Sequence, residues 1–310
     1  MSDCPFCGNR MDRLFMARDY RRPDDRMEWP IGWCTTCQYG RLEGNFSPTK
    51  VGSFYSMPYY THDIIAKPKG NLAFLDRLRT HLAWRADSGI ELQPREIAHA
   101  GQQGRLTFCD LGCGSGGQLR AFKELGYQVI GVEPDPKARS VAGRIGDVLD
   151  GTAEDLPPQI ADRQFDVVLF SHVLEHCIDP VKALANAKRI LAADGTLVIE
   201  VPNNGAIGFA WFKAAWPSTD IPRHLNFFTE QSLRALLQRS GFKITDVKYV
   251  GYTRQFVPEW IAMQEDIWRQ IGTGSKPKFG RAAWRLLFRT AFASRASKYD
   301  SIRVHAKRLS

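Results

Sequence analysis

The sequence contains no run of about twenty apolar residues, so a membrane-spanning helix is not expected. It begins Met-Ser-Asp-Cys, without a basic stretch followed by an apolar one, so we expect no secretory leader and a cytoplasmic location. Cysteine is scarce, with seven in 310 residues, and in a reducing cytoplasm thiols bind metal or stay free rather than pair. The length allows one large domain and a small one.

Acidic residues are nearly absent from the last part of the chain. From Lys276 onward there are ten lysines or arginines and one acid, Asp300, whereas the preceding residues include 32 basic and 32 acidic ones. The formal net charge of +9 therefore belongs to this tail. No recognition motif for nucleic acid accompanies the charge, so nucleic acid is not the expected partner.

Within the tail, residues 281–294 have the period of an amphipathic helix. One face holds Trp284, Leu287, Phe288, Ala291 and Phe292, and the basic side holds Arg281, Arg285 and Arg289. Such a helix can lie on an anionic membrane surface, and it can equally pack on its own domain with a solvated basic face. The sequence alone supports both interpretations.

Four of the seven cysteines form two C-x-x-C pairs, Cys4 with Cys7 and Cys34 with Cys37, separated by 26 residues. Four thiolates at this spacing can close tetrahedrally around zinc, and a disulfide pair is the alternative. A segment this short cannot bury enough apolar surface to fold unaided, so the metal would supply its stability. Because a closed four-sulfur site has no open position, we expect structural zinc without a chemical role.

Residues 106–117 predict a strand, a glycine-rich turn and the start of a helix. The strand ends at Asp110, and Gly112 and Gly114 allow the turn to approach a ligand closely. A second apolar run, residues 127–132, ends at Glu133, whose carboxylate can accept both hydroxyls of a ribose. Together these features predict an adenosine-type ligand at the ends of two parallel strands. The same spacing occurs in nicotinamide enzymes, so it does not choose the cofactor.

Strand and helix patterns alternate from residue 106 onward. The predicted strands cover 106–110, 127–132, 148–149, 165–170, 196–201 and 242–250, and a predicted helix covers 181–191. The run 165–170 is nearly all apolar, as in a strand buried on both faces. This alternation is typical of an α/β protein with a doubly wound parallel sheet, whose ligand lies at the carboxyl ends of the strands.

Five stretches resemble, in order, the motifs of class I S-adenosylmethionine-dependent methyltransferases. They are Asp110-Leu-Gly-Cys-Gly-Ser-Gly, Glu133, Gly151-Thr-Ala-Glu-Asp-Leu-Pro157, Phe165 to His176, and Leu191 to Gly195. The resemblance covers about residues 106–250. It implies a Rossmann-like, mostly parallel seven-stranded sheet, here joined to a small zinc ribbon and a basic helical C-terminal extension. The expected domains are a zinc module (1–45), a helical connector (46–105), the cofactor domain (106–255) and the extension (256–310).

The resemblance also implies a role for each matching residue. Asp110 and the backbone of Gly112 and Gly114 would hold the methionine end of S-adenosylmethionine, and Glu133 would hold its ribose. Thr152, Ala153 and Glu154 would flank the adenine, Glu154 through its side chain or its backbone alone, and Ser171 would line the methyl-donor side. The sulfonium and ammonium groups of the cofactor suit a pocket with an acid at its mouth.

The stretch His172-Val-Leu-Glu175-His176 allows a second interpretation. On a helix, H-x-x-E-H is the inverted zinc-peptidase pattern, with two histidines on one face. The same stretch is similar to the E-x-x-E-H segment of ubiquinone-type O-methyltransferases, proposed as a metal site, with His172 in place of the first acid. We expect a pocket wall and the start of a helix here. Contact with substrate or metal, and zinc hydrolysis, are the alternatives.

Two further segments provide candidate acceptor contacts. Residues 203–216 carry Phe209, Trp211, Phe212 and Trp216, which suggest an apolar or ring-shaped acceptor or else a core-packed helix. In the segment that follows, His224 is the candidate general base, because histidine titrates near neutrality, and the alternative is a histidine that only fixes the loop. Arg223 could bind an anionic group such as phosphate. Thr229 should cap a helix that runs to Ser240.

The connector offers another open choice. Leu72, Leu75, Leu78 and Leu82 follow a helical period, and Tyr59 and Tyr60 lie in an aromatic cluster before them. The connector is either a helix packed on the sheet edge or an N-terminal flap over the substrate, with Tyr59 or Tyr60 touching it.

A four-cysteine module joined to this fold is also similar to C-methyltransferases of nucleotide-linked keto-sugars, whose Tyr-x-Glu-His segment corresponds to Ile221-Pro-Arg223-His224 here.

We therefore expect an enzyme that transfers the methyl group of S-adenosylmethionine to a small-molecule acceptor. The acceptor would be a sugar-linked, lipid-linked or secondary-metabolite hydroxyl or carbon. A non-catalytic scaffold that uses the zinc module and the basic tail is one alternative, and an RNA methyltransferase is another. For the basic helix of this cytoplasmic protein, packing on its own domain and peripheral contact with the inner membrane surface are the two alternatives.

Overall fold

The computed structural model describes residues 1–56, 74–87, 106–271 and 278–309. The chain forms two compact units, each built from several stretches of sequence. The first unit comprises Met1–Gly89, Pro202–Ser232 and Tyr249–Ile302, and the second comprises Ile90–Val201, Leu233–Lys248 and Arg303–Ser310. The domain boundaries expected at residues 45, 105 and 255 stay predictions. None of the helices in the described ranges has the length and apolar character needed to cross a bilayer.

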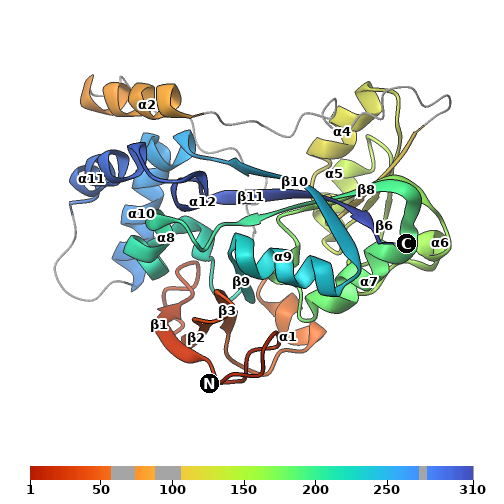
Figure 1. The fold of residues 1–310 in the computed structure, drawn as a ribbon, viewed down its shortest axis with the longest axis horizontal. Helices are drawn as coiled ribbons and strands as arrows, with labels where there is room; N and C mark the ends of the chain where they lie inside the picture. The colour runs from red at the N-terminus through yellow and green to blue at the C-terminus, as the bar shows by residue number, and fades with distance from the viewer. Residues whose placement is uncertain (57–73, 88–105, 272–277, 310) are drawn as a thin grey trace. The chain divides into compact units, whose positions relative to one another are not determined.

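The second unit is built on a seven-stranded sheet in the order β10-β11-β8-β7-β4-β5-β6 (Figure 1). Its strands are β4 (Thr107–Leu111), β5 (Gln128–Val132), β6 (Asp147–Leu149), β7 (Phe165–Ser171), β8 (Leu191–Pro202), β10 (Phe242–Val250) and β11 (Ser301–Arg308). The four neighbouring pairs from β8 to β6 are parallel. The predicted fold class is confirmed. The seventh strand, β11, lies within the extension that we expected to be helical.

Helices cover both faces of this sheet, with α4 and α5 on one side and α7 and α9 on the other (Figure 1). They are α4 (Gly117–Glu124), α5 (Pro136–Ala142), α6 (Pro158–Ala161), the 3-10 helix η1 (Leu174–His176), α7 (Pro180–Ile190) and α9 (Glu230–Arg239). Asp179 caps α7 by accepting from the N–H groups of Val181 and Lys182, and Pro180 supplies a preset φ at its first position. The predicted helix at 181–191 is therefore present.

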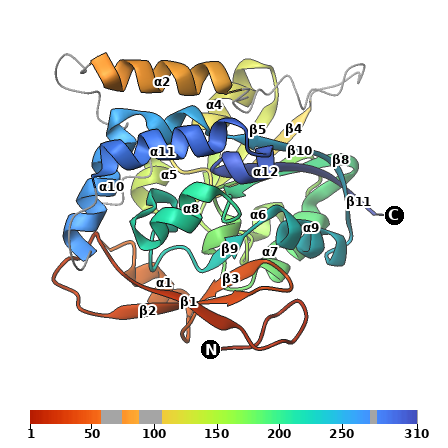
Figure 2. The same ribbon diagram turned by 60° about the vertical axis from the view of Figure 1, so that its left-hand side comes forward.

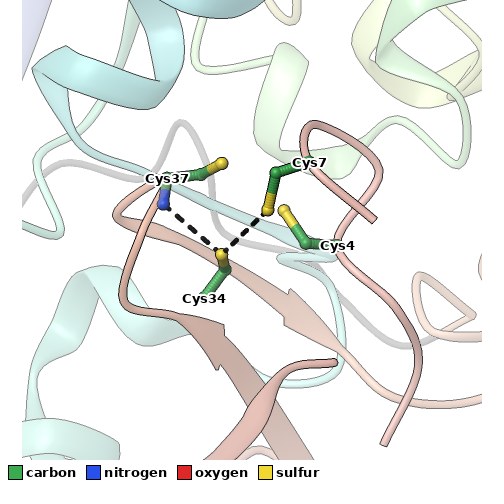
Figure 3. A group of neighbouring side chains, drawn as sticks. All are labelled: Cys4, Cys7, Cys34 and Cys37. Atoms are coloured by element: carbon green, nitrogen blue, oxygen red, sulfur yellow. Dashed lines mark hydrogen bonds between the residues drawn. The ribbon is translucent and has the colours of Figure 1, made fainter. Parts of the chain in front are cut away.

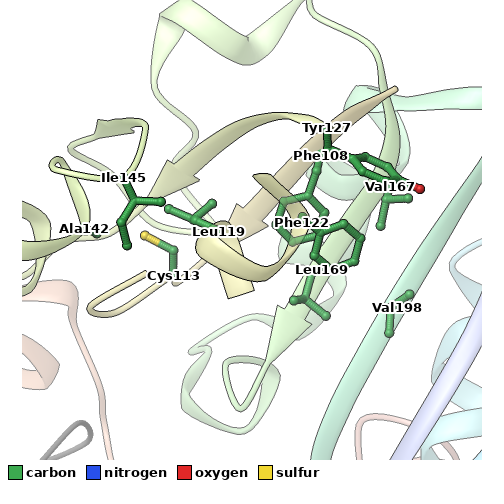
Figure 4. Close-up of a cluster of buried hydrophobic side chains, with 10 residues drawn as sticks. All are labelled: Phe108, Cys113, Leu119, Phe122, Tyr127, Ala142, Ile145, Val167, Leu169 and Val198. Atoms are coloured by element: carbon green, nitrogen blue, oxygen red, sulfur yellow. The ribbon is translucent and has the colours of Figure 1, made fainter. Parts of the chain in front are cut away.

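A buried apolar cluster joins β4 to α4 in the second unit (Figure 4). The rings of Phe108 and Phe122 stack with their centroids 3.8 Å apart, and Tyr127 packs edge-on against Phe122. This packing fixes α4 directly after the glycine-rich turn. A helix N-terminus therefore follows the end of β4, as the sequence pattern predicts.

The first unit contains a four-stranded antiparallel sheet in the order β1-β2-β3-β9. Its strands are β1 (Asp12–Arg18), β2 (Glu28–Cys34), β3 (Tyr39–Leu42) and β9 (Asn226–Phe228). Its helices are α1 (Pro48–Ser53), α2 (Phe74–Ala86), α8 (Ile207–Phe212), η2 (Lys213–Ala215), η3 (Pro217–Thr219), η4 (Thr253–Phe256), α10 (Pro258–Ile271), α11 (Phe279–Ala291) and α12 (Arg295–Lys298). The fourth strand thus comes from a part of the chain far from the other three.

The aromatic residues of 203–216 mostly pack inside the first unit. Phe209 and Trp216 are buried, and the rings of Trp216 and Trp260 meet edge to face at 5.2 Å. The ring of Phe209 lies 6.2 Å from that of Phe227 in β9. Trp211 is the exposed member of the group. For Phe209 and Trp216 the core-packing alternative is the one observed.

The helix α2 has its leucines on the outside. Leu75, Leu78 and Leu82 are all exposed, whereas Arg79 and Ala83 form the buried side. The expected packing of this leucine stripe on the sheet edge is therefore wrong for the three leucines that the structure describes. Leu72 and the predicted flap residues Tyr59 and Tyr60 lie outside the described residues.

Candidate cofactor site and four-cysteine cluster

The turn after β4 folds against the end of β5. Asp110 pairs in register with Gly131, and the N–H groups of Gly112 and Cys113 both donate to the carbonyl oxygen of Val132. Gly112 has φ +81°, and a Cβ there would come within 2.5 Å of Val173 Cγ2. Only glycine fits such a position, because the backbone conformation and the space both exclude a side chain.

Glu133, directly after β5, is held by two backbone donors. The N–H of Gly114 donates to Oε2 (2.8 Å) and that of Asp135 donates to Oε1 (2.9 Å). Burial raises the pKa of Glu133, while these two hydrogen bonds act in the opposite direction. Each oxygen keeps a second acceptor position, which matches a pair of donating hydroxyl groups.

Asp110 is buried in the second unit and incompletely bonded. Its side chain is 2% exposed, and Oδ1 has no hydrogen-bond partner among the described residues. Burial, and then the charge of Glu133, raise the pKa of Asp110 to about 8. A buried carboxyl group in this condition is costly unless a donor or a cation completes it. It is therefore the best candidate in this unit for contact with a positively charged ligand.

The three residues expected beside an adenine are part of a bonded loop. Thr152 Oγ1 accepts from the N–H of Asp155, and the carbonyl groups of Ala153 and Glu154 both accept from Asn186 Nδ2. The carboxylate of Glu154 accepts from the N–H groups of Ile178 and Asp179, just before α7. The side chain of Glu154 therefore fixes the start of that helix, which leaves a role through its backbone. Nothing in the sequence pattern of the predicted helix at 181–191 marks Asn186 for this role.

The stretch 172–176 is a turn followed by the short η1. The strand β7 ends at Ser171, and His172 has φ +56°. Because a 3-10 helix has about three residues per turn, His172 and His176 do not share a helical face. The geometry required for the zinc-peptidase interpretation is therefore absent.

His172 instead lies between two carboxylates. Its Nδ1 is 3.2 Å from Glu175 Oε1, and its Nε2 is 3.3 Å from Glu200 Oε1. Although burial by itself lowers it, these two acids raise the pKa of His172 to about 10. The two flanking carboxylates therefore favour the protonated form of the imidazole.

Glu200 also binds Arg303 from β11. The Nε and Nη2 atoms of Arg303 donate to Glu200 Oε2 at 2.9 and 2.7 Å. Burial acts to raise the pKa of Glu200, but His172 and then Arg303 lower it to about 2. Sequence reasoning missed both residues, because Glu200 lies within an apolar strand pattern and Arg303 was counted with the basic tail.

Buried ion pairs in the first unit fix the segment that contains His224. Arg223 is fully buried, and its guanidinium donates to both oxygens of Asp19 (2.8 and 3.1 Å) and to Asp220 (2.9 Å). The charges of Arg223 and Arg21 lower the pKa of Asp220 well below its usual range, although burial acts to raise it. The guanidinium of Arg223 therefore forms internal ion pairs instead of the expected contact with an anionic substrate.

The imidazole of His224 is oriented by the backbone. Its Nδ1 lies 2.9 Å from the carbonyl oxygen of Ser218, so Nδ1 carries the proton in the neutral ring and Nε2 carries the lone pair. The side chain is 7% exposed. This tautomer suits a general base that acts through Nε2. His224 belongs to the first unit, whereas all eight predicted cofactor residues belong to the second.

The four cysteines predicted to bind metal come together in the first unit (Figure 3). Their sulfur atoms all lie within 4.8 Å of one another, and Cys7 Sγ is 3.6 Å from Cys34 Sγ. The N–H of Cys37 points at Cys34 Sγ (3.4 Å), and Gly8 turns the first knuckle at φ +74°. All four are free thiols rather than disulfides. Four convergent thiols form a donor set that could hold zinc.

The second cysteine knuckle contacts the segment that follows His224. The Gln231 side chain donates to the carbonyl oxygen of Thr36 (2.9 Å), and the Thr229 hydroxyl donates to that of Gln38 (2.8 Å). The hydroxyl of Tyr39 donates to Asn226 Oδ1 (2.5 Å). The cysteine cluster therefore supports the start of α9, which Thr229 caps as predicted through a reciprocal pair of bonds with Ser232.

Comparisons with known proteins agree with the pattern of the second unit. A protein-family model described as "Methyltransferase domain" matches residues 66–247, more than half of the chain. The chain is 27% identical over 223 residues to a protein of Rhodopseudomonas palustris named ubiquinone biosynthesis O-methyltransferase, covering 67% of this chain and 85% of that protein. It is 31% identical over 156 residues to the protein of that name from Cereibacter sphaeroides, covering 46% and 62%.

Solved structures show the same likeness at lower identity. A SAM-dependent methyltransferase from Archaeoglobus fulgidus is 20% identical, with a TM-score of 0.48, covering 74% of this chain and 94% of that one. One from Mesorhizobium loti is 18% identical, with a TM-score of 0.46, covering 69% and 95%.

Proposed function

The chain belongs to the methyltransferase-domain family of class I S-adenosylmethionine-dependent enzymes, and on this premise we propose how its residues hold the donor and which acceptor they serve. The observation that carries the proposal is Asp110, a buried carboxyl group with an unpartnered oxygen beside a glycine turn. An acid in this state fits a ligand that brings a positive charge, and S-adenosylmethionine brings two.

We propose that the donor spans the ends of β4 and β5. Asp110 and the backbone of Gly112 and Gly114 bind the methionine end, and Glu133 accepts from the ribose hydroxyls. Thr152, Ala153 and the backbone of Glu154 flank the adenine, and Ser171 lines the methyl-donor side. The glycine turn, the two free acceptor positions of Glu133 and the bonded loop at 152–154 all support this arrangement.

When bound, S-adenosylmethionine supplies a methyl group activated by its sulfonium charge. The protein contributes position, because holding the donor and the acceptor in line at short range supplies much of the rate. It also contributes a base. His224 Nε2 takes the proton that the acceptor hydroxyl or carbon loses, and the Ser218 carbonyl keeps the ring in the required tautomer. Arg223, Asp220 and Asp19 position the segment from inside.

For the remaining components, we propose structural zinc in the four-cysteine cluster and a small-molecule acceptor that is sugar-linked, lipid-linked or a secondary metabolite. Free thiols throughout suit a cytoplasmic enzyme. The basic C-terminal helix would give it peripheral contact with an anionic membrane. A non-catalytic scaffold has no need of a buried, unpartnered Asp110, which favours the enzyme.

Titration calorimetry with S-adenosylmethionine tests the donor site, with Glu133→Ala as the site variant and Asp162→Ala as an exposed control on the same unit. We expect one equivalent of donor bound by wild type and the control, and weak binding by Glu133→Ala. Equal binding by all three proteins would refute the site. Mass analysis of candidate acceptors for a gain of one CH2 group then identifies the substrate.

A further inference from the structure

The helix α2 presents an apolar face to solvent. It is held by its other side, where the buried Arg79 donates to the carbonyl oxygen of Phe256 (3.0 Å) and Ala83 is fully buried. Four side chains share this face and are between 36% and 76% exposed: Phe74, Leu75, Leu78 and Leu82. Trp84 is also exposed, on another side of the helix. Soluble proteins rarely expose so many large apolar side chains on one element unless that surface binds something.

The helix α11 adds aromatic and basic side chains. Its buried side holds Leu286 and Leu287, so the predicted apolar face is split: Leu287 packs inward, but Phe288 and Phe292 are 69% and 98% exposed. Arg281, Arg285 and Arg289 are exposed along the same outward side. The sequence pattern predicts the arginines and the two phenylalanines on separate faces, whereas in the structure both are exposed on the outward side.

These two helices lie side by side in both views (Figures 1 and 2). The end of α2 is tied to the same part of the first unit, because Lys298 donates to the carbonyl oxygen of Ala86 (2.7 Å) and Thr253 N–H donates to Asp87 (2.9 Å). We call the outward sides of α2 and α11 the α2–α11 surface. Both helices are therefore anchored to the same part of the first unit, which holds the exposed apolar side chains of the α2–α11 surface in place.

The charge of this surface has one sign. Five exposed arginines belong to the two helices: Arg77, Arg85, Arg281, Arg285 and Arg289. Their sequences contain a single acid, Asp76, and it pairs with the buried Arg79 at 2.8 Å. The surface thus offers large apolar side chains among positive charges, with no exposed acid left unpaired on it.

We infer that the α2–α11 surface binds an anionic lipid bilayer, with its aromatic and leucine side chains at the level of the headgroups. Interleaved aromatic and basic residues are the composition of helices that lie in a membrane interface. A second copy of the chain fits poorly, because a symmetric contact would oppose arginine to arginine. The proposed contact through the basic C-terminal helix is thereby extended to α2.

A cavity beside α11 connects this surface to the choice of acceptor. It has a volume of about 340 Å³, and its walls include Trp211, Phe212, Trp268, Phe279 and Arg285. Four aromatic rings and one guanidinium suit an apolar chain that ends in an anionic group. Resting on the proposed methyl transfer, this favours the lipid-linked acceptor among the classes named above.

Vesicle co-sedimentation tests the inference, using phosphatidylcholine alone and its equal mixture with phosphatidylglycerol. We expect strong binding to the mixture and little to the neutral vesicles. Each arginine near an anionic surface contributes about fivefold, so the triple variant Arg281→Gln, Arg285→Gln, Arg289→Gln should bind about 100-fold more weakly. The control removes the same charge from exposed sites elsewhere, as Arg10→Gln, Arg13→Gln, Lys243→Gln, and should lose far less.

The apolar part needs its own variants. Phe288→Gln and, on α2, Leu78→Gln replace exposed side chains, so both proteins should fold, and each should bind the anionic vesicles about tenfold more weakly. Equal binding to both vesicle types, equal losses in the control triple, or unchanged binding by Leu78→Gln would overturn the inference. So would a concentration-dependent dimer in sedimentation analysis that these substitutions abolish.

Failure of this inference is separable from failure of the proposed function. Every surface variant should bind S-adenosylmethionine as wild type does, and Asp110→Asn should lose donor binding while keeping vesicle binding. The chain-binding step is tested with decyl phosphate, which should quench the fluorescence of the cavity residues Trp211 and Trp268 in wild type and much less in a double variant, Trp211→Phe with Trp268→Phe. Equal quenching of the two proteins would overturn chain binding in this cavity. Phosphate ion alone should leave the fluorescence unchanged.

Discussion

Replacing Asp110 by asparagine should stabilise the free protein while abolishing tight donor binding. Asparagine has the same shape and no charge. In the free protein, Asp110 has a pKa raised to about 8 from 3.8, because it is buried without a full set of partners. A buried carboxyl group in this state destabilises the free protein, and a bound cationic ligand would offset that cost.

The magnitude and its pH dependence follow from proton linkage. Between pH 4 and 8 the folded protein keeps a proton on Asp110 that the unfolded chain has released, so this residue lowers stability progressively as pH rises through that window. At pH 7 the loss amounts to as much as about 4 kcal/mol. Asparagine does not titrate, so the variant does not lose this stability. The stability advantage of Asp110→Asn should therefore vanish near pH 4, grow up to pH 8, and level off above.

Thermal unfolding from pH 4 to 9 measures this effect. At roughly 2–4 °C per kcal/mol, the variant should melt up to about 10–20 °C above wild type at pH 8 and together with it at pH 4. In the same samples, affinity for S-adenosylmethionine should fall about 100-fold or more, because the buried cation loses its partner. A variant that is less stable at every pH, or that binds the donor normally, would refute the reasoning about Asp110.

Three further results are expected. His224→Asn should lower kcat roughly 100- to 10,000-fold with donor affinity unchanged, because only the base is lost; an unchanged pH profile of kcat would contradict this. Cys34→Ser should reduce zinc content measured by atomic emission and increase hydrogen exchange at 226–231, and full protection there without zinc would count against the supporting role of the cluster. Asp19→Asn should lower the free energy of unfolding by about 1–3 kcal/mol, because the buried Arg223 loses the charge of Asp19 but keeps that of Asp220, and unchanged stability in urea unfolding would contradict the role of this ion pair.

Sequence reasoning succeeded where the determinants are local. Asp110 and Glu133 each end an apolar run, and strands that are parallel and adjacent bring such ends together. The two cysteine knuckles likewise follow from spacing within short turns. Thr229 as a helix cap needed only its own neighbours.

It failed where a partner is distant in sequence or where a helix has two plausible sides. Arg303 pairs with Glu200 across 103 residues, and nothing near either residue marks the other. The strand β11 was hidden in a basic tail. In α2 the period identified a helix but not its inner side, because the buried Arg79 is bound by the carbonyl of Phe256, which is distant in sequence, and by Asp76.

The most direct test of the central claim is calorimetric titration of the wild-type protein with S-adenosylmethionine at pH 7 in two buffers of different ionisation enthalpy. The account predicts one bound equivalent and release of most of one proton, because Asp110 starts largely protonated and becomes ionised against the cation. Release should decline above pH 8. Binding without proton release, or no binding, would contradict the account.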